Sequence, residues 1–184
     1  MTFSFDTSGY NIDAKIFDKA LVRTLNDTAK TVKSEISKVV RAYYNIKKKD
    51  LDPKMKISKA TKGRDEAIIK VTSRPIGLIH FNATQSIAKR KGAKTYYKTS
   101  AKILKQSRKG VVKGAFIGKA KGSNSLQVFR RTTDKQYPII KLSVISPTSM
   151  VNKEGMDTAD RVIKDKFNTT FERHYKFYAS KAKR

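Results

Sequence analysis

Residues 108–122 read RKGVVKGAFIGKAKG, with a glycine at every fourth position. A repeat of this kind fits three different structures: a phosphate-binding loop, the packing seam of a membrane helix, or a bent β-strand. The first would indicate a nucleotide-binding enzyme and the second a membrane protein. The glycines of the repeat are Gly110, Gly114, Gly118 and Gly122.

Neither a phosphate loop nor a membrane seam fits this stretch. A phosphate loop follows the pattern G-x-x-x-x-G-K-[ST], but the step from Gly114 to Gly118 is one residue shorter, and Lys119 is followed by an alanine. A membrane seam needs a continuous apolar helix, and lysines interrupt this one. In a soluble helix each glycine costs about 1 kcal/mol relative to alanine, which also disfavours a helix here.

The structure that remains is a strand over residues 111–118. We expect the chain to enter it by a turn at Gly110 and to leave it by a glycine-rich loop at Gly122. Gly114 and Gly118 then mark bulges, bends or places of close backbone approach. The repeat is predicted to be structural.

Amphipathic helices are predicted on both sides of this region, over residues 14–44 and 157–180. Apolar side chains recur there mostly at steps of three or four, with Asp13 as the candidate N-cap of the first helix and Asp157 or Thr158 of the second. The predicted stripes are Ile16, Ala20, Leu25, Thr28 or Ala29, Val32, Ile36, Val39 and Tyr43 on the first helix, and Ala159, Ile163, Phe167, Phe171, His174 and Tyr178 on the second.

Between the helices, residues 55–146 form a β-rich basic core, preceded by a turn or short helical excursion at Pro53. Short runs rich in Val, Ile, Tyr and Phe predict strands joined as an antiparallel meander. The fold class is therefore α+β: a long N-terminal amphipathic helix, an antiparallel β-sheet and a C-terminal helix, in a single domain over residues 1–184. The runs are EAIIKVTS (66–73), IGLIHFN (76–82), TYYKTSAKIL (95–104), VVKGAFIGK (111–119), LQVFRR (126–131) and PIIKLSVI (138–145).

The composition is that of a folded protein, with 38% hydrophobic and 31% charged residues among 184. No cysteine is present, which excludes disulfides and thiolate metal sites and favours a reducing compartment. No apolar run approaches the ~20 residues of a membrane helix, so no membrane partner is expected. The N-terminal residues carry no recognisable secretory signal.

Charge is the dominant feature of the composition, with a net charge of +27. The excess is concentrated in residues 51–150, which hold 23 basic and four acidic side chains, and no carboxylate side chain lies between Glu66 and Asp134. Such a field repels other copies of the chain unless an anionic partner or an acidic protein surface lies against it.

No catalytic or metal-binding constellation is recognisable. His80 and His174 are far apart and belong to no ligand-spaced cluster, so each is expected to be a packed or interface histidine. The middle of the chain has too few carboxylates for a metal site, and Ser146 has no nucleophile-elbow context. We therefore expect no enzyme, no cofactor and no metal.

Residues 89–113 are the candidate binding segment, because basic side chains are interleaved there with Tyr96 and Tyr97. A strand would place Lys94, Lys98 and Lys102 on one face. Such a row can follow a phosphate backbone without reading bases, or dock on an acidic neighbouring subunit, and both readings stay open. The candidate contact residues for DNA or an acidic partner are Lys89, Arg90, Lys91, Lys94, Lys98, Lys102, Arg108 and Lys109.

Several segments together resemble the phage minor tail protein Z family. The resemblance covers roughly residues 20–151, and its order and spacing are more specific than any single motif. Two departures concern subunit contacts: Ser146-Pro147-Thr148-Ser149 replaces a Gly-Pro-Ser turn, and the lysine-rich insert at 87–109 is longer. The segments are ALVRTLNDTAKTVKSEISKVVRAYYNIKKKDL (20–51), MKISKAT (55–61), RPIGLIHFNA (74–83), KGVVKGAFIGKAKG (109–122), LQVFRR (126–131) and YPIIKLSVISPTSMV (137–151).

This resemblance implies a structural virion protein that acts in tail completion at the head-proximal end of the tail, after assembly in the host cytoplasm. It implies a homo-oligomeric ring, with six-fold symmetry favoured, that supports head–tail joining and DNA passage. The implied partners are tail and neck proteins such as the tail terminator or connector, together with double-stranded DNA in the channel. The alternative is a free-standing basic protein that binds nucleic acid independently of sequence.

Overall fold

The computed structural model describes residues 13–88, 96–133, 135 and 137–182 of the chain. These residues form two compact units. The first, here called the helical unit, comprises residues 1–36, 55–70 and 153–184, and the second, the sheet unit, comprises residues 37–54 and 71–152. The expectation of a single domain over the whole chain stays a prediction.

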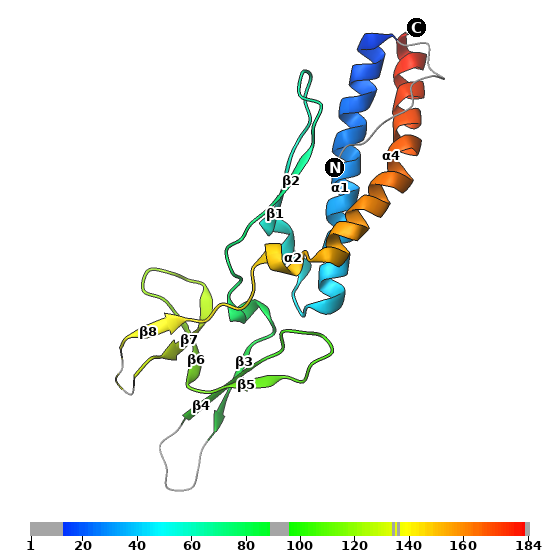
Figure 1. The fold of residues 1–184 in the computed structure, drawn as a ribbon. Coiled ribbons are helices and arrows are strands. Elements are labelled where there is room, and N and C mark those ends of the chain that lie inside the picture. The colour runs from blue at the N-terminus through cyan, green and yellow to red at the C-terminus, as the bar shows by residue number, and fades with distance from the viewer. Residues whose placement is uncertain (1–12, 89–95, 134, 136, 183–184) are drawn as a thin grey trace. The chain divides into compact units, whose positions relative to one another are not determined.

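Two 30-residue helices, α1 (Ala14–Tyr43) and α4 (Lys153–Ala182), run side by side in opposite directions (Figure 1). All of α4 and residues 14–36 of α1 belong to the helical unit, and the end of α1 belongs to the sheet unit. The helical unit also contains the two-stranded sheet of β1 (Met55–Ser58) and β2 (Ile68–Val71). The Asp13 carboxylate caps α1, accepting the backbone N–H of Lys15 at 2.9 Å. The prediction of a helix over residues 14–44 is confirmed.

The buried face of α1 follows the predicted stripe through Val32 and Ile36 and then departs from it. Val40 is 1% exposed, whereas Tyr43 is 47% exposed, so the predicted end of the stripe at Val39 and Tyr43 is wrong by one position. The predicted stripe takes a step of three from Ile36 to Val39, whereas the buried face takes a step of four to Val40; with 3.6 residues per turn, either step is compatible with one face.

The second helix begins at Lys153, four residues before the predicted start. Asp157 and Thr158 are therefore not caps but lie within α4, where Thr158 is buried. Glycine has a low helix propensity, so Gly155 argued against a helix that begins before it, although it is itself helical and buried. Most of the predicted stripe is confirmed, with Phe167, Phe171 and His174 buried.

The sheet unit contains two three-stranded antiparallel sheets, with strand orders β3-β4-β5 and β6-β7-β8. Its core contains Leu78, Ala101, Ala115 and Val128. The strands are β3 (Thr84–Ala88), β4 (Tyr96–Ala101), β5 (Gly110–Val112), β6 (Ala115–Lys119), β7 (Leu126–Arg131) and β8 (Ile139–Lys141), and the short helices are α2 (Lys48–Leu51), η1 (Asp52–Lys54), η2 (Leu78–His80) and α3 (Pro147–Met150). The α+β class is confirmed, and so is the short helical excursion at Pro53.

The glycine repeat forms two strands rather than the single strand predicted. β5 pairs with β4, whereas β6 pairs with β7, so the chain passes from one sheet to the other between Val112 and Ala115. Gly114 makes this passage with a φ of +69°, which side chains with a Cβ rarely adopt. The predicted loop at Gly122 is confirmed, with φ +76°, but Gly110 opens β5 and pairs with Ala101 instead of forming a turn.

Two further predictions in this region need correction. The run IGLIHFN (76–82) is not a strand, because η2 occupies its centre and buries Leu78. Short apolar runs cannot be assigned by periodicity alone, since a buried helical turn shows the same pattern. Strand β3 was not predicted, because its sequence TQSIA is largely polar. Within the described residues, no helix is long and apolar enough to cross a membrane.

Candidate functional site

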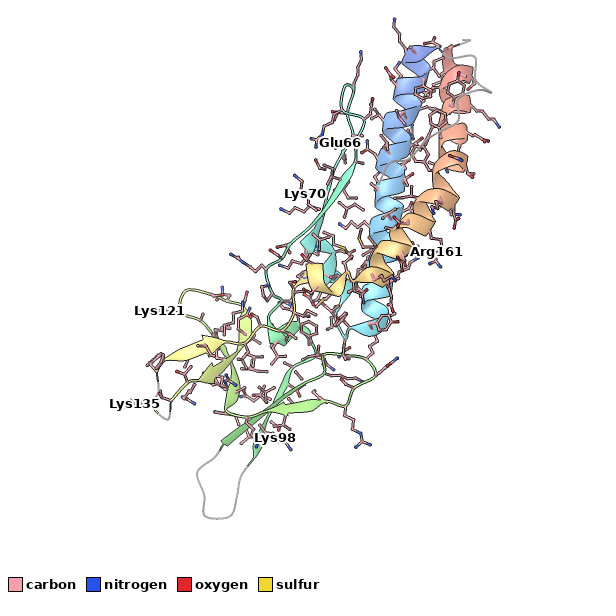
Figure 2. The ribbon with its side chains drawn as sticks, in the orientation of Figure 1. Glu66, Lys70, Lys98, Lys121, Lys135 and Arg161 are labelled. Carbon is pink, nitrogen blue, oxygen red and sulfur yellow. The ribbon has the colours of Figure 1, made fainter. Side chains whose placement is uncertain are left out.

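The structure describes half of the eight candidate contact residues. Lys98 lies on β4, Lys102 follows directly after that strand, and Arg108 and Lys109 immediately precede β5 (Figures 1 and 2). The other four lie outside the described residues: Lys89, Arg90, Lys91 and Lys94.

One face of the β3-β4-β5 sheet brings lysines and hydroxyl groups together. Thr84 is the register partner of Ser100, and Ser86 is the partner of Lys98, and antiparallel partners share a face. Lys109 reaches the same face, because its Nζ donates a hydrogen bond of 2.7 Å to Thr84 Oγ1. We call the surface formed by these five residues the sheet face. Four of its side chains are exposed, and that of Ser100 is half-buried.

The opposite side of β4 fixes the sheet face in position. Thr99 is fully buried, and its hydroxyl donates a hydrogen bond of 2.8 Å to the carbonyl oxygen of Ala115 on β6. The side-chain oxygen of Gln85 on β3 accepts a hydrogen bond from the backbone N–H of Ile117. These contacts connect the back of the strands to the second sheet, so Lys98 projects from a supported strand.

Lys102 and Arg108 lie outside the paired strands and are not among the residues that form the sheet face. The side chain of Lys102 is half-buried, and its backbone is held by Phe81, whose carbonyl oxygen accepts its N–H at 3.0 Å, and by Asn45, whose amide donates to its carbonyl oxygen at 3.1 Å. Arg108 is exposed in the segment that leads to β5. The structure thus brings Lys98 and Lys109 together on one face.

The chemistry of the sheet face suits an anionic polymer. Lysine ammonium groups act as point charges for phosphates, and serine and threonine hydroxyls are common phosphate donors. The sheet unit holds 23 basic and three acidic side chains, a net charge of +20, so few carboxylates compete for these lysines. The hydroxyl residues were missed at the sequence level, because β3 was not predicted. The available signal was the pair of hydroxyl residues at positions i and i+2, Thr84 and Ser86, which share a face if the segment is a strand.

Each histidine faces an aspartate. In the sheet unit, His80 Nδ1 lies 3.1 Å from Asp50 Oδ1. In the helical unit, His174 Nε2 lies 3.1 Å from Asp27 Oδ2, and the other oxygen of that carboxylate accepts a hydrogen bond of 2.9 Å from Lys30. The expectation of a packed histidine is confirmed for His174, which is 5% exposed.

The environment shifts the pKa values of this aspartate and histidine in the same direction. The hydrogen bond from Lys30, with a smaller contribution from His174, lowers the pKa of Asp27 below its ordinary value. Burial lowers the pKa of His174, because it disfavours the charged imidazolium more than the neighbouring carboxylate stabilises it. The structure therefore favours a neutral imidazole against an ionised carboxylate, which connects α1 to α4.

Among residues 13–88, 96–133, 135 and 137–182, no three His, Asp or Glu side chains are grouped in a way that could hold a metal ion. The described geometry is therefore that of an α+β protein with an antiparallel helix pair and a cationic sheet face.

The chain belongs to the family of prophage minor tail protein Z (GPZ), whose family model matches residues 10–180. No curated protein and no solved structure matched the chain. As a member of this family the chain is a phage minor tail protein, a component of the virion, and membership favours a structural role over an enzymatic one.

Proposed function

We propose that the chain is a non-enzymatic tail completion protein at the head-proximal end of the tail, where it supports head–tail joining and the passage of DNA. The observation that carries this proposal is the sheet face, a supported basic surface in a unit of net charge +20, within a member of a tail protein family. The family membership favours this role over a free-standing nucleic-acid-binding protein.

The protein functions as a homo-oligomeric ring, with six-fold symmetry favoured, in contact with neck and tail proteins such as the tail terminator or connector. A highly cationic subunit resists self-association unless anions or acidic surfaces compensate its charge. DNA in the channel supplies this compensation, and Lys98 and Lys109 contact its phosphates alongside the hydroxyls of Thr84 and Ser86.

The DNA contact is tested by replacing Lys98 and Lys109 together with glutamine. The matched control replaces Lys121 and Lys135 with glutamine, which removes the same amount of charge from exposed loops of the sheet unit (Figure 2). Binding of the full chain to random-sequence double-stranded DNA is measured across a salt series. The sheet-face variant should lower the slope of log K against log salt by about 2, more than the control does. Equal slopes for the two variants would show that the sheet face does not contact DNA.

The role in joining is tested by deleting the coding sequence from the phage and supplying the protein from a plasmid. Without the protein, heads and tails should accumulate separately, and the wild-type protein should restore complete particles. Normal joining in the deletion strain would refute the role in tail completion.

A further inference from the structure

A second cationic surface lies in the helical unit and shares no residue with the sheet face. It is a groove of about 690 Å³ formed by α1, the loop between β1 and β2, and Tyr178 of α4. Six of its lining side chains are basic and two are acidic. The basic ones are Lys15, Lys19, Arg23, Lys30, Lys59 and Lys62.

Most of these cations are available to a ligand. Lys30 is engaged by Asp27, and Arg23 donates a hydrogen bond of 3.4 Å to the hydroxyl of Tyr178 and lies over the ring of Phe177. The remaining four are exposed lysines, and none of them forms an ion pair with another described residue. They are Lys15, Lys19, Lys59 and Lys62.

The loop that carries two of these lysines is held against α1. The side-chain amide of Asn26 donates to the carbonyl oxygen of Ala60 at 3.0 Å, and its oxygen accepts the N–H of Ala60 at 2.9 Å. Ala60 is 3% exposed. Beyond it, the backbones of Thr61 and Arg64 exchange two hydrogen bonds, of 3.1 and 2.9 Å, around a turn. The backbone that carries Lys59 and Lys62 is therefore held in place before any ligand arrives, which lowers the entropic cost of ordering the loop on binding.

We propose that this groove binds the phosphate backbone of double-stranded DNA, independently of sequence. Lysine binds phosphate as a point charge, whereas the guanidinium fork that recognises carboxylates in a bidentate manner is supplied only by Arg23, which Tyr178 and Phe177 already engage. The one amide in the lining, that of Asn26, already bonds Ala60 through both its nitrogen and its oxygen, so it is not free for the bidentate contact by which an asparagine reads adenine. An acidic segment of a protein partner is the competing ligand.

This inference goes beyond the proposed function, because it gives the helical unit a DNA contact of its own and does not depend on where the chain sits in the virion. It predicts that the salt dependence of DNA binding by the full chain has contributions from both units, and that each can be removed separately.

The experiment replaces Lys15, Lys19, Lys59 and Lys62 together with glutamine in the full chain. The matched control removes four charges from exposed positions of the same unit outside the groove. These are Lys56, Lys70, Lys164 and Lys166. Both variants are compared with the wild type by fluorescence anisotropy, using random-sequence double-stranded DNA in a salt series and polyglutamate as a competing polyanion. Unchanged thermal unfolding establishes that both variants are folded.

The groove variant should lower the salt slope by about 3 to 4, and weaken DNA binding at least about tenfold at low salt, whereas the control should lower the slope by less than about 1. Equal losses in the two variants would show that only net charge matters and would overturn the proposal. An unchanged slope in the groove variant would also overturn it. A groove mutation that reduces binding of polyglutamate but not of DNA would assign the groove to an acidic protein partner instead.

Discussion

Replacement of Asp27 by alanine is the sharpest test of how α1 and α4 are connected. Its Oδ2 lies 3.1 Å from His174 Nε2, and its Oδ1 lies 2.9 Å from Lys30 Nζ. An ionised carboxylate can only accept hydrogen bonds, so the imidazole Nε2 carries the proton. Alanine would leave this N–H group buried without a partner, because His174 is 5% exposed.

The two contacts of this carboxylate differ in their expected contribution to stability. Leaving a buried donor without a partner costs about 1–3 kcal/mol. The ion pair with Lys30 is worth about 0–1 kcal/mol, since the lysine side chain is 61% exposed. We therefore expect Asp27→Ala to lower the free energy of unfolding by about 2–3 kcal/mol and Lys30→Ala by less than about 1 kcal/mol.

The assay is urea unfolding followed by far-ultraviolet circular dichroism at neutral pH, which reports on the long helices. Asp27→Asn serves as the control, because its side-chain oxygen can still accept from His174, and it should lie between the wild type and Asp27→Ala. If Asp27→Ala were no more destabilising than Lys30→Ala, the contact with His174 would contribute nothing and the reasoning would be refuted.

Three further predictions concern other features of the two units. Because burial lowers the pKa of His174, its imidazole takes up a proton more readily in the unfolded chain than in the folded chain as the pH falls below about 6.5. Stability should therefore decline on acidification below that value, and His174→Gln should flatten the decline in urea unfolding measured across pH; an identical profile would contradict the assignment. Gly114→Ala should cost about 1–2 kcal/mol, since φ is +69°, whereas Gly110→Ala should change stability by less than about 0.5 kcal/mol; equal melting temperatures would argue against strain at the passage between the sheets. Asn26→Ala removes no charge but releases the loop beside α1, so it should weaken DNA binding several-fold in the anisotropy assay, and unaltered binding would show that the position of the loop is unimportant.

The long helices were predictable because their apolar spacing persists over many turns, which averages out local exceptions. The ends of the stripes were not, since a drift of one position moves burial from Val39 to Val40. Short elements depend on context: TQSIA is a strand only because β4 pairs with it, and the centre of IGLIHFN is a helical turn that packs into the core. Gly114 was predicted to mark a bulge, a bend or a close backbone approach, but the change of sheet is a tertiary event that local sequence does not encode.

The candidate sites show the same division between local and tertiary information. The basic segment was visible in the composition, and Lys98 falls on a strand as expected. The hydroxyls beside it come from β3, and the groove combines α1 with the loop at Lys59 and Lys62. The contact between Asp27 and His174 joins residues 147 positions apart. Pairings of this kind require the fold.

The most direct test of the central claim is the location of the protein in purified phage particles. Gold-conjugated antibodies raised against the full chain would be applied to intact particles and viewed by electron microscopy, with particles of the deletion strain as the control. The proposed role predicts label at the head–tail junction. Label at the distal end of the tail, or no label on particles whose junctions are accessible, would contradict it.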